Sequence, residues 1–284
     1  MTTIESLSRV CQDEDHAALY AACETGVGLC TIVGIDGSFS RRIGAQLAIL
    51  PDGTTAGSLS DGCLEAQLAA DLRGAEVPKI IRYGQGSAKI DFRLPCGGGL
   101  DILLDPRPDR DDCRQAVRSL EDRCPATIAL PKPTPLAVRK YIPQLRIIAV
   151  GEGPELEAFG KLGEAAGAAI AVHPADNLPL SAPMQIGPLD RWTAVLLLFH
   201  DHERELALLA DALSGGAFYI GAQGGENART SRVLALAANG ISEEDIARVR
   251  SPVGLIAGCK SPSTLALSAL AEIVGEYEHM RAAD

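Results

Sequence analysis

Aromatic residues are scarce, because tryptophan, tyrosine and phenylalanine make up only 4% of the 284 residues. Hydrophobic residues nevertheless reach 46%, so the core must consist mainly of alanine, valine, isoleucine and leucine. A surplus of positive charge is also missing: 26 Lys and Arg stand against 37 Asp and Glu, a net charge of −11. Nonspecific binding to nucleic acid or to a membrane surface needs a basic surface, so we expect neither.

Eight cysteines are too few for a disulfide scaffold in a chain of this length, and the sequence contains no Cys-x-x-Cys pair. We expect reduced thiols, one or two of which have a function. The N-terminus lacks a basic start followed by an apolar core, so no signal peptide is predicted. No apolar run approaches the ~20 residues of a membrane-spanning helix. Together these absences predict a cytoplasmic protein.

Glycine, in contrast, is plentiful, and many of the 29 glycines adjoin apolar segments where backbone can approach backbone or ligand closely. The length favours two domains over one. Residues 1–122 mix short strands and helices, which predicts a mixed α+β domain. The prolines of residues 123–143 predict a linker. Strand–helix alternation in residues 144–284 predicts a Rossmann-like domain with a doubly wound parallel sheet, so the chain is of the α/β class.

Local patterns predict the individual elements. Expected strands span residues 29–33, 45–50, 54–59, 79–83, 90–94, 100–104, 145–150, 168–172, 194–199 and 217–220. Expected helices span residues 1–24, 64–72, 113–120, 155–167, 202–213, 227–239 and 261–277. Ser60 or Asp61 is expected to cap the helix at residues 64–72.

One candidate ligand site follows the continuous apolar run at residues 145–150, which is typical of a strand buried on both faces. Gly151 and Gly153 come next, at a turn whose backbone N–H groups and helix dipole can hold phosphate. The third glycine of the dinucleotide pattern is replaced by Leu156, and His173 stands where NAD-binding domains usually carry an acid. A tight turn without a ligand is therefore an equally good interpretation.

A second candidate is the triplet His200-Asp201-His202, directly after the expected strand at residues 194–199. Carboxyl ends of strands line the ligand crevice in open α/β sheets, so these side chains could bind metal or carry protons. Close neighbours in a loop do not converge automatically, and the sequence shows no third or fourth ligand. Capping of the next helix by His200 or Asp201 is the alternative.

Cys63 and Cys96 form a third candidate, because each stands beside glycine at a turn. Cys63 is expected to begin a helix, where the dipole lowers the pKa of a thiol and favours the thiolate. A thiolate is a soft ligand for metals and suits sulfur chemistry. Because buried cysteines are commonly structural, each can also be a core residue.

The fourth candidate is the loop at residues 37–44, which contains the adjacent Arg41 and Arg42. Two arginines among small residues suit a bidentate grip on phosphate or another oxyanion. In a chain this acidic they could also form surface ion pairs, but we favour anion binding.

Taken together, these segments resemble the XdhC/CoxI family of xanthine dehydrogenase accessory factors over residues 25–277. In the first half the matching motifs are Gly37-Ser38, Arg41-Arg42-x-Gly44-Ala45, Asp52-Gly53, Gly57-Ser58-Leu59, Gly62-Cys63-Leu64-Glu65, Cys96-Gly97-Gly98 and Asp105-Pro106. In the second half they are Val150-Gly-x-Gly-Pro, His200-Asp201-His202, Tyr219-Ile-Gly221-Ala222, Pro252-x-Gly254-Leu255 and the helix at residues 267–273. The order and spacing of the set are more specific than any single motif.

The resemblance implies a carrier and not an enzyme. Family members bind the molybdenum cofactor, a molybdopterin, and shelter it while a cysteine desulfurase installs a terminal sulfur. They then deliver it to an apo-molybdoenzyme of the xanthine dehydrogenase or CO dehydrogenase group. The family motifs imply these cofactor-binding residues: Arg41, Arg42, Gly62, Cys63, Glu65, Cys96, Gly97, Gly98, Gly151, Gly153, His200 and Gly221. Cys63 and Cys96 are expected to contact the metal or its sulfur.

Two other functions fit the sequence. One is an NAD(P)-dependent oxidoreductase that uses the second domain, with His200 or His202 as acid or base. The other is an interaction scaffold that binds the client enzyme but no cofactor. A homodimer is expected from base rates alone.

Overall fold

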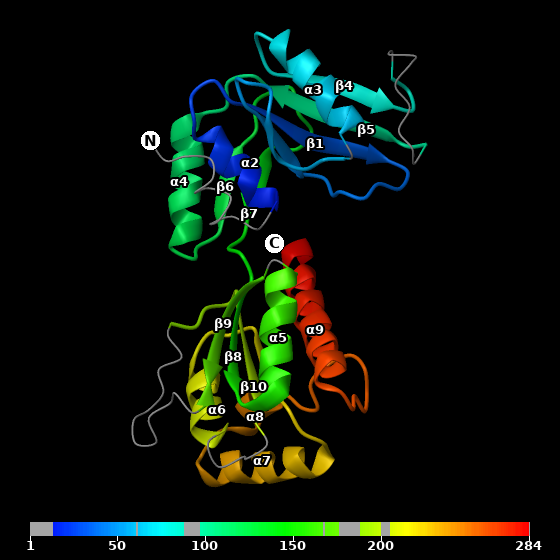
Figure 1. The fold of residues 1–284 in the computed structure, drawn as a ribbon. Coiled ribbons are helices and arrows are strands. Elements are labelled where there is room, and N and C mark those ends of the chain that lie inside the picture. Colours follow the sequence, from blue (N-terminus) through cyan, green and yellow to red (C-terminus); the bar gives the residue numbers. More distant parts are fainter. Residues whose placement is uncertain are drawn as a thin grey trace. The chain divides into compact units, whose positions relative to one another are not determined.

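The two halves of the chain form different kinds of β-sheet, antiparallel in the first and parallel in the second (Figure 1). The computed structural model describes residues 14–60, 62–87, 97–166, 168–175, 188–199 and 205–283. It divides into two compact units, residues 1–143 and residues 144–284. The expected α/β class, with a Rossmann-like parallel domain in the second half, is confirmed.

The sheet of the first unit has the order β3-β2-β1-β5-β4, and all its neighbouring strands are antiparallel. Helix α3 (Cys63–Arg73) covers one face, and helices α2 (Glu14–Ala22) and α4 (Arg110–Glu121) share a core with the other. Because both faces are covered, the first six residues of β1 are all buried. The strands are β1 (Gly28–Asp36), β2 (Gln46–Ile49), β3 (Thr55–Gly57), β4 (Lys79–Gly84) and β5 (Gly99–Asp105).

A two-stranded hairpin, β6 (Ala126–Ala129) and β7 (Val138–Tyr141), completes the first unit. Its inward side chains Ile128 and Tyr141 are buried in the same core as α2 and α4. Residues 126–141, which we expected to lie in a linker, therefore belong to this unit. The prolines at positions 131, 133 and 135 fall between the two strands, where a missing N–H breaks no ladder hydrogen bond.

The sheet of the second unit has the order β12-β11-β10-β8-β9, and all neighbouring pairs are parallel. The chain leaves β8 toward β9 on one side and then crosses to β10 on the other, so the order reverses between β8 and β10. Ligands of doubly wound sheets bind outside the carboxyl ends of the strands at such a point. The strands are β8 (Arg146–Gly151), β9 (Ala169–Pro174), β10 (Thr193–Leu198), β11 (Tyr219–Ala222) and β12 (Val249–Arg250).

Helices cover both faces of the parallel sheet (Figure 1). Helices α5 (Gly153–Ala165) and α9 (Pro262–Ala283) pack side by side on one face. On the other face, helices α6 (Glu205–Ser214), α7 (Glu226–Ala238) and α8 (Glu243–Ala247) share a core with β8, β10 and β11. The strand expected at residues 90–94 lies outside the described residues. Within the described ranges, none of the helices combines the length and apolarity that crossing a bilayer requires.

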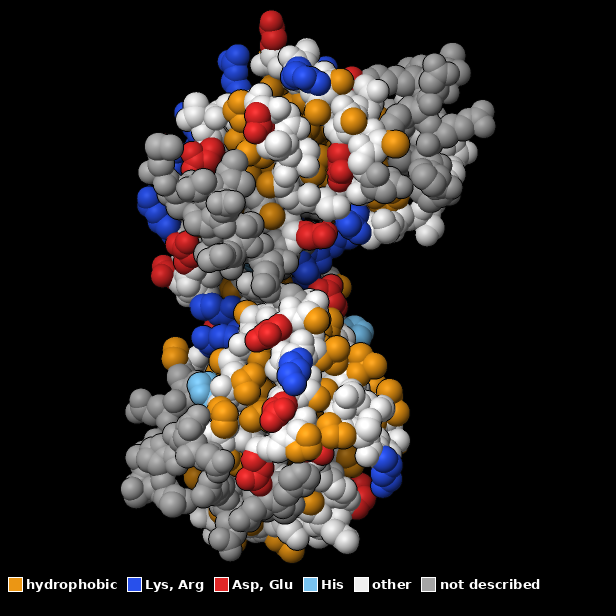
Figure 2. Space-filling model, in the orientation of Figure 1, with side chains coloured by type: hydrophobic (Ala, Val, Ile, Leu, Met, Phe, Trp, Pro, Cys, Tyr) orange, Lys and Arg blue, Asp and Glu red, His pale blue; other side chains and the backbone are white. Residues whose placement is uncertain are grey.

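Hydrophobic side chains also reach the surface of the second unit over α5 and α9 (Figure 2). Leu267 and Val274 are partly exposed on α9, and their spacing of seven places them on one side of the helix. Ala269, Leu270 and Ile273 are buried on its inner side. Helix α9 therefore carries apolar residues on both its inner and its outer side.

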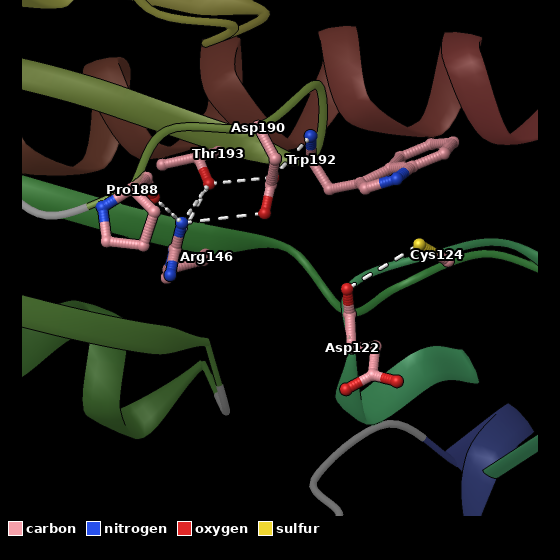
Figure 3. Close-up of polar contacts among 7 residues, drawn as sticks. All are labelled: Asp122, Cys124, Arg146, Pro188, Asp190, Trp192 and Thr193. Atoms are coloured by element: carbon pink, nitrogen blue, oxygen red, sulfur yellow. Dashed lines mark hydrogen bonds and ion pairs between the residues drawn. The ribbon is translucent and has the colours of Figure 1, made fainter. Parts of the chain in front are cut away.

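The amino ends of β8 and β10 are joined by the side chain of Arg146 (Figure 3). Its Nε and Nη2 donate to Thr193 Oγ1 over 3.1 and 2.9 Å, and Nη2 also donates to the carbonyl of Pro188. Asp190 Oδ1 accepts from the Thr193 hydroxyl and from the N–H of Trp192, each over 2.9 Å. This network lies at the edge opposite the carboxyl ends of the strands, so it joins β8 to β10 away from the edge where doubly wound sheets bind ligands.

Candidate functional site

The loop at residues 37–44, called the arginine loop below, connects β1 to β2 in the first unit. Gly37 and Gly44 have φ values of +81° and +90°, so glycine is required near both of its ends. The N–H of Gly44 donates to Ile32 O over 2.7 Å, and the N–H of Ala45 donates to Arg42 O over 3.1 Å. These bonds give the loop a defined closing turn directly after its two arginines.

Arg41 connects the arginine loop to the segment that precedes α3. Its Nε donates to Ser58 O over 3.3 Å, and its Nη2 donates to Ser58 Oγ over 3.0 Å. Nη2 also forms a 3.4 Å ion pair with the exposed carboxylate of Glu14. Arg41 thus forms the surface ion pair of the alternative interpretation, and a third of its side chain stays exposed. Arg42 is half-buried beside it.

Helix α3 begins at Cys63 after a glycine, and not after a polar cap. Gly62 occupies the cap position with a φ of +94°, so the expected cap by Ser60 is wrong, and Asp61 lies outside the described residues. Glu65, in the first turn, instead accepts the N–H of Leu59 over 3.2 Å and that of Ser60 over 3.3 Å. A carboxylate that reaches back from this turn replaces the cap and suits the helix dipole. Glu65 therefore holds the loop that presents Cys63.

Cys63 is exposed, unlike several other cysteines of the first unit. Burial raises the pKa of the Cys113 thiol to about 12 and raises the pKa of Cys30 further. Burial also raises the pKa of the half-buried Cys23. A buried protonated thiol is a poor nucleophile and a poor metal ligand, so these three cysteines are weaker candidates for the site than Cys63. Cys96, the expected companion of Cys63, lies outside the described residues.

The second glycine-rich turn packs against the start of the arginine loop. A Cβ on Gly98 would lie 2.4 Å from Asp36 O, and a Cβ on Gly37 would lie 3.6 Å from the Cα of Gly98. Gly98 O also accepts the N–H of Gln85 over 2.9 Å. The structure thus places Gly97-Gly98 at one end of the arginine loop, while Arg41 bonds to the segment before Cys63.

Arg82, which has no motif in the sequence, fixes this end of the loop. Its guanidinium donates to the carboxylate of Asp36, to Asp101 Oδ2 over 2.9 Å and to Gln85 O over 2.9 Å. The bond to Asp36 is the main reason why the pKa of Arg82 is raised. A Cβ on Gly99 would lie 2.3 Å from Arg82 Nη2, so glycine leaves room for the guanidinium. Arg82 therefore connects the ends of β1, β4 and β5 around the glycine turn.

In the second unit, Gly151 and Gly153 form the turn between β8 and α5. A Cβ on Gly151 would lie 2.1 Å from Leu198 O. Packing against β10 is therefore enough to require glycine at this position, without any role in ligand binding. Glu152 is the cap residue of α5 and Glu155 lies in its first turn, which places carboxylates where a pyrophosphate would bind. This arrangement favours the tight turn without a phosphate and weakens the case for NAD(P).

Gly221 is a strand residue, and His200 cannot be placed. Gly221 lies inside the buried strand β11, where a Cβ would lie 3.0 Å from Val253 Cγ1 and 2.6 Å from the ring of Tyr219. Packing therefore explains why position 221 requires glycine. His200, with Asp201 and His202, lies outside the described residues. Among the residues that the structure describes, no three His, Cys, Asp or Glu side chains group as a metal site.

A buried ion pair between Arg232 and Glu205 holds the carboxyl edge of the parallel sheet. Arg232 Nη2 lies 3.0 Å from Glu205 Oε1, and their side chains are only 4% and 1% exposed. Arg232 also donates to Ser251 Oγ over 2.7 Å and to Gln223 O over 2.8 Å. It therefore connects the start of α6 and the segments after β11 and β12, and it lines a cavity of about 400 Å³. Gln223, whose carbonyl accepts from Arg232, lines a second cavity of about 710 Å³ together with Phe199, Gly224, Gly225, Glu226, Asn227, Ala228 and Ser231.

Comparison with known proteins identifies relatives of both units. Residues 21–84 match the XdhC and CoxI family, and residues 147–273 match the XdhC Rossmann domain. The molybdenum cofactor insertion chaperone PaoD of Escherichia coli is 34% identical over 273 residues, covering 89% of this chain and 84% of that protein. A Bacillus subtilis protein, named as a probable subunit of xanthine dehydrogenase, is 25% identical over 313 residues, covering 87% of this chain and 92% of that protein.

A solved structure shares the fold. The crystal structure of a protein described as a xanthine dehydrogenase from Bacillus halodurans superimposes with a TM-score of 0.69 at 19% identity. The match covers 92% of this chain and 95% of that one. With both family regions present in order and 34% identity to PaoD across most of both proteins, the chain belongs to the XdhC and CoxI family.

Proposed function

We propose that this protein binds the molybdenum cofactor as cargo, protects it during sulfuration and delivers it to a molybdoenzyme of the xanthine dehydrogenase or CO dehydrogenase group. The relationship to a molybdenum cofactor insertion chaperone supports the general role. The observation that carries the proposal is the bonding of Arg41 to Ser58, which joins the arginine loop to the helix that begins with the exposed Cys63.

The residues gathered there match the chemistry of this cargo. Molybdopterin carries a phosphate, for which a guanidinium is a suitable partner, and Arg41 and Arg42 provide two. Its metal is held by sulfur, and a thiol such as Cys63 is a soft ligand for a metal of this kind. Apart from its chain neighbours, a Cβ on Gly62 would meet no atom of the described residues within 4 Å, which suits close approach of a ligand to the backbone. The proposal therefore groups these two cations with the thiol of Cys63, because Arg41 bonds to the segment that precedes it.

The same surface suits the proposed partners. A cysteine desulfurase must bring a persulfide to the bound metal, and an exposed thiol at a helix start is reachable by another protein. The client is an apo-molybdoenzyme that accepts the completed cofactor. A homodimer stays a prediction that gel filtration with light scattering can test.

The test compares Cys63→Ser with Cys124→Ser, because Cys124 is also exposed and lies in the same unit. Each variant is purified without oxygen from cells that make molybdopterin, and bound molybdenum and pterin are measured. We expect Cys63→Ser to retain at least ~10-fold less molybdenum, a loss of about 1.4 kcal/mol, and Cys124→Ser to match the parent. If the parent holds no pterin but binds NADH at micromolar concentration, the carrier role is wrong. Equal retention by both variants would remove Cys63 from the site.

A further inference from the structure

Arg139, on the inward face of β7, packs against Gly44 at the end of the arginine loop. We propose that Arg139 is a positioning residue: it fixes the closing turn at Gly44 and thereby the directions of Arg41 and Arg42. The importance of this position for cofactor retention rests on the proposed function, in which these two arginines hold the anionic cofactor. The positioning of the closing turn by Arg139 is proposed independently of that function.

The contact with Gly44 is direct. A Cβ on Gly44 would lie 3.1 Å from Arg139 Cδ, 3.3 Å from its Nε and 3.7 Å from its Cζ, so the arginine side chain runs along the backbone of the turn. The residue is only 9% exposed, so the turn packs against a buried side chain. Because Gly44 also has a φ of +90°, both conformation and packing require glycine there.

Arg139 is itself held by a chain of buried contacts. Its Cζ lies 4.6 Å from the centroid of the Tyr141 ring, and its guanidinium donates to Lys140 O. The Tyr141 hydroxyl donates to Gln46 Oε1 over 2.5 Å, and Gln46 Nε2 donates to Thr31 Oγ1 over 3.0 Å. Gln46 lies in β2 and Thr31 in β1, the two strands that the arginine loop connects. Through Tyr141 and Gln46, Arg139 is therefore connected to both strands that flank the arginine loop.

The residue type is unexpected for a position that serves stability alone. Side chains of β7 alternate between exposed and buried, and the inward positions are Arg139 and Tyr141. An aliphatic residue would fill an inward strand position without the cost of removing a guanidinium from water. The arginine offers what an aliphatic residue cannot: a long side chain with a planar guanidinium beside Gly44, and a positive charge near a loop that contains Arg41 and Arg42.

Trypsin cleaves after Arg41 and Arg42, so the rate of cleavage at these two positions can report on opening of the arginine loop. Proteolysis requires local opening of a loop, so its rate measures how firmly the loop is held. The full-length protein without cofactor is digested, and fragments cut at these two positions are followed by mass spectrometry. Arg139→Met should increase cleavage there by about tenfold and leave cleavage in the second unit unchanged. Arg139→Lys, which keeps the chain alongside Gly44 and the charge, should restore most of the protection.

Two control variants separate positioning from general stability. Lys140→Met changes an exposed neighbour on the same strand and should behave as the parent. Tyr141→Phe removes the bond to Gln46, so it should lower the thermal stability without a comparable increase in loop cleavage. Cleavage that follows thermal stability equally in Arg139→Met and Tyr141→Phe would overturn the positioning role. Faster loop cleavage with unchanged molybdenum retention would support that role and count against the arginine loop in the proposed function.

Discussion

The two units place glycine at their candidate sites for different reasons. In the first unit, Gly62 has a positive φ and open space around it, next to the exposed Cys63. In the second unit, Gly151 and Gly221 leave no such space, because backbone or side chains already occupy the place of a Cβ. A glycine that faces open space can admit a ligand, whereas one pressed against a neighbouring strand serves packing. The motifs of the first unit therefore support a ligand site more strongly than those of the second.

The arginines of the two units differ in the same way. Arg41 and Arg82 are partly exposed and bond to the ends of loops. They therefore hold surface loops in place while their side chains stay in contact with solvent. Arg232 is buried with Glu205 and connects three segments inside the fold. The comparison predicts that changes in the second unit act mainly on stability, and that changes in the first act mainly on cofactor retention.

The largest effect is expected from Arg232→Met, which leaves Glu205 buried without its ion-pair partner. Loss of one member of a buried pair costs roughly 3–5 kcal/mol, so urea unfolding followed by circular dichroism should show a much less stable second unit. Arg250→Met is the matched control, because its ion pair with Glu276 is about half exposed and worth at most about 1 kcal/mol. A loss for Arg232→Met no larger than that of the control would contradict a structural role for the buried pair.

An intermediate effect is expected from Gly98→Ala, because the new Cβ would lie 2.4 Å from Asp36 O and must displace backbone. Overpacking of this kind costs about 1–3 kcal/mol and should disturb the start of the arginine loop. We expect reduced molybdenum retention in protein purified without oxygen. Gly225→Ala, at the cap of α7 where the Cβ would meet nothing within 4 Å, should retain the parent amount. Reduced molybdenum retention in both variants would contradict the prediction that only changes in the first unit affect retention.

The smallest effect concerns Asp105 at the end of β5. Burial raises the pKa of this carboxyl above its usual value, so its charged form is less favourable in the folded state than in the unfolded one. This carboxyl therefore favours folding most at low pH and loses that contribution as the pH rises through its folded-state pKa. Asp105→Asn should therefore raise the stability slightly at pH 7, and this gain should shrink as the pH falls through the raised folded-state pKa and be lost below the unfolded-state value of about 3.9. A gain in urea unfolding that is independent of pH would exclude desolvation of the carboxylate as its cause.

The sequence predicted what local patterns determine. The apolar run at residues 145–150 became β8, an interior strand between β10 and β9, and the glycine turns and the arginine loop lie where the motifs suggested. The hairpin at residues 126–141 was missed, because its prolines resemble those of a linker and its strands have only four residues each. A period-two alternation at Val138–Tyr141 was the available signal.

The supporting arginines could not be predicted from the sequence. Arg82 bonds to Asp36 across 46 residues, and Arg232 bonds to Glu205 across 27, so no local motif contains both partners. Glu65 was expected to contact the cofactor because of its motif, yet it bonds to the backbone of Leu59 and Ser60. A motif can show that a residue matters without showing whether it contacts the ligand or holds the loop that does.

The bond between Tyr141 and Gln46 has a consequence for the order of events during synthesis. Its partners are 95 residues apart, and Tyr141 comes just before the boundary at residue 143. The arginine loop is therefore synthesised well before the hairpin that contacts it. Until the hairpin emerges, the apolar residues of α2 and α4 lack part of their cover. Nearly the whole first unit must therefore be translated before the contacts between the hairpin and the strands around the arginine loop can form.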